Sequence, residues 1–128
     1  MKKRFIGILI LLAIFASCGQ NPFTPDAELV ARLVLDGQMQ KVMTWYGRPM
    51  FTGYVKNIGD AAAWNVMVAI TCYSDAEKTT IIDVANGFPA SGGDIPRNQR
   101  AYFEAIVFGC DSWDEIKDFT VKITWLNR

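Results

Sequence analysis

Histidine is absent from the 128-residue sequence. Histidine is the commonest general base in enzymes and a frequent ligand of transition metals, because its imidazole titrates near neutral pH. Its absence excludes Ser-His-Asp and Cys-His catalytic machinery, and no spacing of Ser or Lys residues places a nucleophile beside a base. We therefore expect a protein that is not an enzyme, with no catalytic residues and no cofactor.

Clusters of basic residues are also missing beyond the first few positions. The chain has 13 Lys and Arg against 13 Asp and Glu, and three of the basic residues are Lys2, Lys3 and Arg4. Without residues 1–17, ten basic residues remain against 13 acidic ones, a net charge of about −3 at neutral pH. Nucleic-acid binding needs a positively charged surface, so nucleic acid is not an expected partner.

No apolar run in the sequence has the length of a membrane span. The run from Phe5 to Phe15 covers 11 residues, whereas a transmembrane helix needs about 20. It follows a basic start and precedes the small residues Ala16 and Ser17. This layout is typical of a secretory signal peptide, which we expect to comprise residues 1–17.

The cysteine that follows, Cys18, is the last residue of a four-residue motif. The stretch Phe15-Ala16-Ser17-Cys18 resembles the lipobox of bacterial lipoproteins, although Phe15 replaces the usual aliphatic residue at the first position. The resemblance implies that lipoprotein signal peptidase cleaves before Cys18 and that acyl chains such as palmitate are attached there. Each buried methylene of such a chain contributes about 0.8 kcal/mol, so two or three chains hold a protein durably on a membrane. The alternative is an ordinary signal peptide followed by an incidental cysteine.

Lipidation of Cys18 would place the protein in the cell envelope, with the membrane as its first partner. Gly19 follows the cysteine, where an Asp would signal inner-membrane retention in enterobacteria-like systems. We therefore expect outer-membrane attachment facing the periplasm in a Gram-negative cell, and the outer face of the cell membrane otherwise. Residues 18–27 contain two prolines and are predicted to form the lipid-anchored tether. Residues 28–128 have the length of one domain.

Two further cysteines, Cys72 and Cys110, form an even pair. In an oxidising compartment such a pair predicts a disulfide. Closing the loop between them, about 38 residues, would stabilise the fold by roughly 4 kcal/mol in the chain-entropy model. Two separately buried thiols are the alternative, and the spacing is unlike a redox Cys-x-x-Cys motif.

Alternation of apolar and other residues indicates β-strands along most of the mature chain. Between residues 64 and 73, one face carries Trp64, Val66, Val68, Ile70 and Cys72. The same period of two recurs over residues 101–107 and 119–125. Six or seven such strands without an internal helix pattern predict an all-β sandwich.

The sequence of residues 28–36 is compatible with either a helix or a strand. Thr24, Pro25 and Glu28 resemble a helix start, with Gly37 as its stop. The same residues are compatible with a strand that turns at Asp36-Gly37. We favour the strand, because the chain downstream is β throughout.

The segment from Met50 to Leu126 resembles the FxLYD family of bacterial immunoglobulin-like domains, which is related to CARDB-like domains. The resemblance rests on a Gly-x-Val-x-Asn-x-Gly pattern from Gly53 to Gly59, on alternating aliphatics that lead to Tyr73, and on the stretch AYFEA. In the name-giving stretch, residues 70–74, only Tyr73 agrees. We expect Asn57 and Gly59 to adopt left-handed backbone angles in a turn.

The family resemblance implies an immunoglobulin-like β-sandwich of six to seven antiparallel strands and no catalytic residues. In such a sandwich the strand that ends at Tyr73 lies antiparallel to the last strand, which starts near Phe119. This arrangement would bring Cys110 close to Cys72.

Two groups of residues are candidates for binding. The first is a possible calcium site, because calcium prefers several carboxylate oxygens, and its four acidic residues are Asp111, Asp114, Glu115 and Asp118. The alternative interpretation is a solvated acidic loop. Exposed Trp and Tyr concentrate binding energy at interfaces, so the candidate partner contacts are Trp45, Tyr46 and Trp113. Trp64 and Trp125 are expected in the core.

The sequence therefore predicts a non-catalytic, lipid-anchored module of the cell envelope that binds or assembles with an unidentified envelope protein. A small-ligand or calcium-binding carrier is the alternative, with the loop from Asp111 to Asp118 as its site.

Overall fold

The computed structural model describes residues 29–127 of the chain. The predicted signal peptide, Cys18 and the tether lie outside the described residues. Within residues 29–127, none of the helical segments has the length and hydropathy of a membrane span. The described elements are β1 (Leu33–Leu35), β2 (Gln40–Met43), β3 (Pro49–Asn57), β4 (Ala63–Tyr73), β5 (Ile81–Gly87), β6 (Arg100–Ile106), the 3₁₀-helix η3 (Trp113–Glu115) and β7 (Asp118–Asn127).

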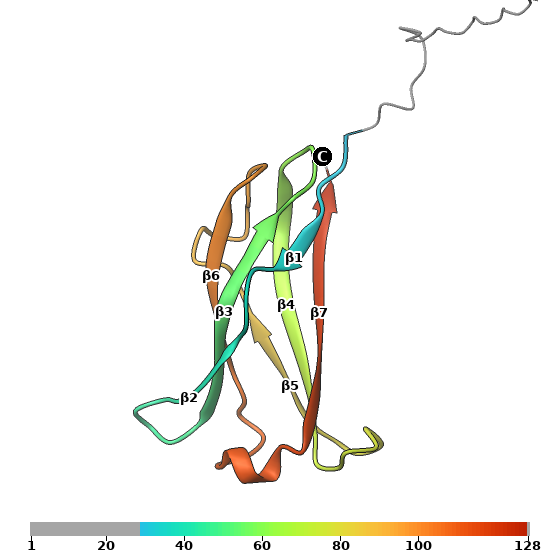
Figure 1. Ribbon diagram of the computed structural model, residues 1–128. Coiled ribbons are helices and arrows are strands. Elements are labelled where there is room, and N and C mark those ends of the chain that lie inside the picture. Colours follow the sequence, from blue (N-terminus) through green and yellow to red (C-terminus); the bar gives the residue numbers. More distant parts are fainter. Residues whose placement is uncertain (1–28, 128) are drawn as a thin grey trace, which may run out of the picture.

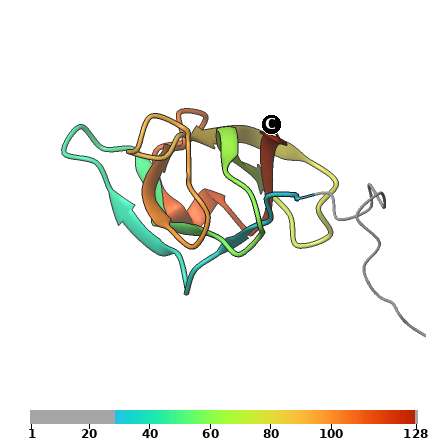
Figure 2. The same ribbon diagram turned by 90° about the horizontal axis from the view of Figure 1, so that it is seen from above.

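All seven strands belong to one antiparallel sheet with the order β1-β3-β6-β5-β4-β7, and β2 also pairs with β3. The sheet curves until it is nearly closed like a barrel (Figure 2). Its pairing is uneven, because β5 meets β6 at the single pair Gly87 and Ala105, whereas β3 and β6 pair from Met50 to Lys56. The prediction of an all-β fold is confirmed.

The core is formed by the inward-facing positions of the strands. In β6 the alternation is as predicted, with Ala101, Phe103 and Ala105 buried. In β7 the predicted face packs against this core while remaining half-buried, through Phe119, Val121, Ile123 and Trp125. The predicted strand within residues 28–36 is confirmed for Leu33–Leu35, which pairs with β3.

A bulge near the start of β4 changes which residues face inward. The register with β7 shifts between Trp64 and Met67, and Asn65 has a φ of 52°. Ala63 is fully buried and Trp64 is half-buried. The expectation that Trp64 shares the inner face with Val66 is wrong, because an extra residue in one strand reverses the alternation on either side of it.

The turn after β3 is stabilised differently from our expectation, since neither Asn57 nor Gly59 has a positive φ. The buried Asn57 amide donates to the carbonyl oxygens of Ala61 (2.8 Å) and Ile95 (3.0 Å). Its oxygen accepts from the backbone N–H of Gly59 (2.9 Å) and of Arg32 (3.2 Å). The side chain therefore holds three separate segments together at one end of the domain.

The chain enters and leaves the described domain at the same end. The backbone N–H of Ala31 donates to the side-chain oxygen of Asn127 at 2.7 Å. The turn between β2 and β3, residues 44–48, projects from the opposite end (Figure 1). The β2–β3 turn therefore lies at the end of the described domain opposite to Ala31 and Asn127.

Candidate functional site

The β2–β3 turn carries two exposed aromatic side chains. Trp45 is 94% exposed and Tyr46 is 46% exposed. Their rings meet edge to face, with centroids 5.1 Å apart. The turn itself is well braced, since Thr44 and Arg48 exchange hydrogen bonds and Gly47 adopts a φ of 85°. A braced turn thus presents an aromatic pair to solvent.

Trp113, the third aromatic candidate, lies in a different environment. Its ring packs edge to face on Phe51, with centroids 4.9 Å apart, and its indole N–H donates to the carbonyl of Val42 at 3.0 Å. The Lys41 ammonium lies 5.6 Å from the same ring. Trp113 therefore joins η3 to β2 and to the core, and the structure does not bring it together with Trp45 and Tyr46.

The outward face of β3 and β6 continues the surface from this turn. Register pairs place Met50 beside Ile106 and Tyr54 beside Tyr102. The two tyrosine rings are 5.5 Å apart, and the Tyr102 hydroxyl donates to Glu104 at 3.0 Å. By register, this face carries Met50, Tyr54, Tyr102 and Ile106 together with Thr52, the carboxylate of Glu104 and two basic residues, Lys56 and Arg100.

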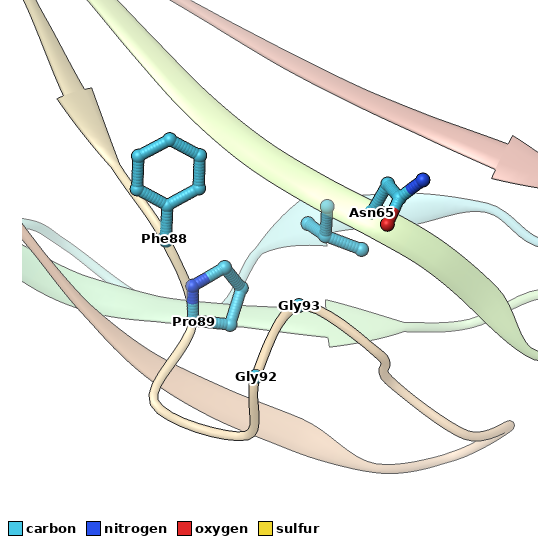
Figure 3. Close-up of a pocket in the computed structure, with 6 residues that line it drawn as sticks. Asn65, Phe88, Pro89, Gly92 and Gly93 are labelled. Carbon is cyan, nitrogen blue, oxygen red and sulfur yellow. The ribbon is translucent and has the colours of Figure 1, made fainter.

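Three hollows lie on or beside this surface, and the first is lined by the β5–β6 loop and the start of β4 rather than by β3 or β6. The first, of about 440 Å³, is lined by Asn65, Val66, Phe88, Pro89, Gly92 and Gly93 (Figure 3). The second, of about 360 Å³, includes Phe88, Ala90, Tyr102 and Glu104. The third, of about 370 Å³, includes Met43, Trp45, Tyr46, Met50, Glu104 and Ile106. Consecutive hollows share a lining residue, Phe88 and then Glu104, and we call the three together the β6 groove.

Backbone geometry shapes the first hollow. Asn65, Gly92 and Gly93 all have positive φ values, of 52°, 85° and 95°. Gly93 accepts a hydrogen bond from the N–H of Val66 at 2.8 Å, which fixes the loop beside β4. A Cβ added at Gly92 would meet nothing within 4 Å, so this side of the hollow is open. Phe88, 64% exposed, lines this hollow (Figure 3) and also the second one.

Glu104 lies at the junction of the second and third hollows, and its side chain is exposed. Within residues 29–127 the ion pairs involve Asp36, Asp111 and Asp118, and none involves Glu104. Burial, followed by the hydrogen bond and charge of Glu104, raises the pKa of the Tyr102 hydroxyl. Tyr102 is therefore a protonated donor to Glu104 at neutral pH.

The four acidic residues near η3 do not form a cluster. Asp111 pairs with Arg48, and Asp118 lies 3.9 Å from the Lys78 ammonium. Glu115 accepts from the backbone N–H of Asp111 at 3.1 Å. In the part of the chain that the structure describes, no three metal-ligating side chains are grouped to hold an ion.

The expected disulfide is not formed in the structure, where Cys72 and Cys110 are buried free thiols. The predicted strand arrangement is confirmed, since Tyr73 pairs with Asp118 and Cys72 with Phe119. However, the Cys72 thiol points toward the carbonyl of Ile70 and the Cys110 thiol toward that of Ser112. Burial first, and then the nearby Cys110 and Asp83, raise the pKa of Cys72 to about 11.

Sequence reasoning identified Trp45 and Tyr46 but missed Glu104, Tyr102 and Phe88 as parts of one surface. The alternation in β6 did place Tyr102, Glu104 and Ile106 on the outward face. What the sequence alone did not supply was the pairing of β6 with β3, which aligns that face with the aromatic turn.

Comparison of the chain with protein-family models, with curated proteins and with solved structures finds no match. Over residues 29–127, the structure itself defines an all-β domain of seven antiparallel strands.

Proposed function

We propose that this protein is a non-catalytic, lipid-anchored module of the cell envelope that binds a protein partner through the β6 groove. The lipid on Cys18 holds it at the membrane, facing the periplasm from the outer membrane in a Gram-negative cell or lying on the outer face of the cell membrane otherwise. The observation that carries the proposal is the exposure of Trp45 and Tyr46 at the end of a groove that continues along β6.

The energetics of interfaces support this assignment. Trp and Tyr supply large contact areas at low entropic cost and dominate the binding energy of many interfaces. Trp45 is exposed to water at 94%, which costs solvation free energy unless another surface covers it. The turn lies at the end opposite to Ala31, so a tethered domain would present it away from the membrane.

We also propose that the domain is an immunoglobulin-like sandwich of the FxLYD or CARDB-like kind. Supporting this, the strands fall into two well-paired groups, β1, β2, β3 and β6 against β5, β4 and β7. The single pair between Gly87 and Ala105 is the only β5–β6 register contact within the described strands. Two groups that face each other across a shared core and meet at one corner are typical of sandwiches.

In-cell crosslinking tests the proposed binding role. An affinity-tagged full-length protein is crosslinked with formaldehyde in its native envelope, and captured proteins are identified by mass spectrometry. We expect a partner that is recovered with the unmodified chain and lost with the double variant Trp45→Ala, Tyr46→Ala. The matched control is Phe108→Ala, since Phe108 is 63% exposed and lines none of the three hollows. Equal recovery with all three proteins would overturn the assignment of the surface.

Fractionation of the same cells tests the anchor. Replacing Cys18 by Ser removes the sulfur that would carry the lipid, so the protein is expected to lose its acyl chains and to leave the membrane fraction. Mass spectrometry of the N-terminal peptide measures the acylation. An unmodified Cys18 in the membrane-bound protein would contradict the lipoprotein proposal.

A further inference from the structure

We infer that the β6 groove binds a basic, extended segment of the protein partner, with a Lys or Arg side chain of that segment placed at Glu104. This inference rests on the proposed function and adds the chemistry of the partner.

The first argument is the position of Glu104. It is the residue shared by the second and third hollows, so its side chain borders both. Tyr102 donates one hydrogen bond to it, and a carboxylate has room for several more donors. Arg100, the basic residue nearest in β6, is paired with Asp36 at 3.2 Å and stacked on Tyr54 at 3.7 Å. Among the described residues, Glu104 therefore keeps an exposed charge that no ion pair neutralises.

The second argument is the chemistry of the walls around that charge. The third hollow joins Trp45 and Tyr46, whose rings are nearly perpendicular at 87°. Aromatic faces attract ammonium and guanidinium groups. Met43 and Met50 line the same hollow, and their flexible side chains adapt to an aliphatic stem. An aromatic and methionine-lined hollow with a carboxylate at its edge fits a long cationic side chain better than a neutral or acidic one.

The third argument is the shape and charge of the molecule. Successive hollows run from Gly92 and Gly93 at one end of the domain to Trp45 at the other, which suits an extended segment rather than a compact ligand. Residues 18–128 carry ten basic and 13 acidic residues. A net negative charge favours the approach of a basic partner.

Peptide titration tests this inference. The probe is a synthetic peptide of alternating Lys and Gly, and the comparison is the same peptide with Gln in place of Lys. Each is titrated into the full-length protein in neutral detergent, and binding is measured by isothermal calorimetry. We expect the Lys peptide to bind at least about tenfold more tightly than the Gln peptide, because a hydrogen bond to a charged group contributes more than a neutral one. Equal binding, or no binding of the Lys peptide, overturns the inference.

Variants locate the interaction. Glu104→Gln keeps the shape of the side chain and an acceptor for Tyr102, so the fold is expected to persist while the Lys peptide loses about tenfold in affinity. Glu77→Gln makes the same chemical change at an exposed turn residue outside the groove, and its affinity is expected to match that of the unmodified protein. Equal losses in both variants would show a general charge effect and would overturn the role of Glu104.

Different experimental outcomes would contradict the inference about basic partners and the proposed binding function. If crosslinking recovers a partner that depends on Trp45 and Tyr46 while Glu104→Gln recovers it equally, the groove is a binding surface without the basic specificity. If no partner depends on the aromatic pair, the proposed function itself fails. Tighter binding of a neutral envelope glycan than of the Lys peptide, unaffected by Glu104→Gln, would also overturn the inference.

Discussion

A single buried polar residue, Asn57, holds one end of this small sheet in place. Asn57 uses both polar atoms of its amide for four hydrogen bonds that reach Arg32, Gly59, Ala61 and Ile95. A buried polar group costs free energy unless it is paired, whereas this one is fully satisfied. Asn57 was expected to act through its backbone angles, and it acts instead through its side chain.

Replacing Asn57 by Ala is expected to lower the free energy of unfolding by about 3 to 5 kcal/mol, because four backbone groups in buried or partly buried hydrogen bonds lose a partner. Urea denaturation followed by circular dichroism measures the change. Asn86→Ala, an exposed position in β5, is the control and is expected to change stability by less than about 0.5 kcal/mol. Similar effects at the two positions would refute the role given to the Asn57 amide.

The buried Cys72 thiol makes stability depend on alkaline pH. Its pKa is about 11 in the folded protein against 9.0 for the free group, so the unfolded chain loses this proton first. The protonated thiol contributes about 2 to 3 kcal/mol to the free energy of unfolding. This contribution is fully present below pH 9 and is lost as the pH rises toward 11. The difference in unfolding free energy between the unmodified protein and Cys72→Ala, measured from pH 8 to 11, should shrink by that amount. A difference that stays constant with pH would contradict this assignment.

At the scale of elements, most strands were predictable because period-two alternation is a local property of the sequence. The alternation over residues 64–73, 101–107 and 119–125 falls on β4, β6 and β7, and the inward residues of β6 are those of the alternation. The bulge at Asn65 was not predictable, since β4 pairs there with residues some 60 positions away. The free thiols and the groove likewise depend on side-chain geometry between distant strands, which periodicity does not encode.

The turn between β3 and β4 gives a test of close packing between elements. A Cβ at Gly59 would lie 2.4 Å from the backbone N of Arg32 and the backbone O of Val30. Gly59→Ala is therefore expected to destabilise the protein by about 3 kcal/mol, since rigid backbone must move. At Gly37 a Cβ would meet open space, but the residue has a φ of 86°. Gly37→Ala is therefore expected to destabilise the protein by about 1 to 2 kcal/mol. Thermal unfolding compares the two, and a larger loss at Gly37 would contradict the packing argument.

At the scale of the whole molecule, the two ends of the near-closed sheet differ in what they carry. The chain enters and leaves the described domain at the end with Ala31 and Asn127. The β2–β3 turn at the other end exposes Trp45 and Tyr46. The three hollows of the β6 groove follow one another from the β5–β6 loop to the β2–β3 turn, so a partner bound in them would lie along the length of the domain. The sequence predicted the aromatic residues, and the topology places them at the end of the described domain opposite to Ala31 and Asn127.

Site-specific photo-crosslinking in the native envelope tests the central claim most directly. A photoreactive residue is placed in turn at positions 45, 88 and 104 in the groove and at positions 77 and 122 outside it. We expect all three groove positions to crosslink to the same partner protein and the two outer positions to give no such product. Crosslinks from positions 77 and 122 that equal those from the groove, or none from the groove, would contradict a binding role for this surface.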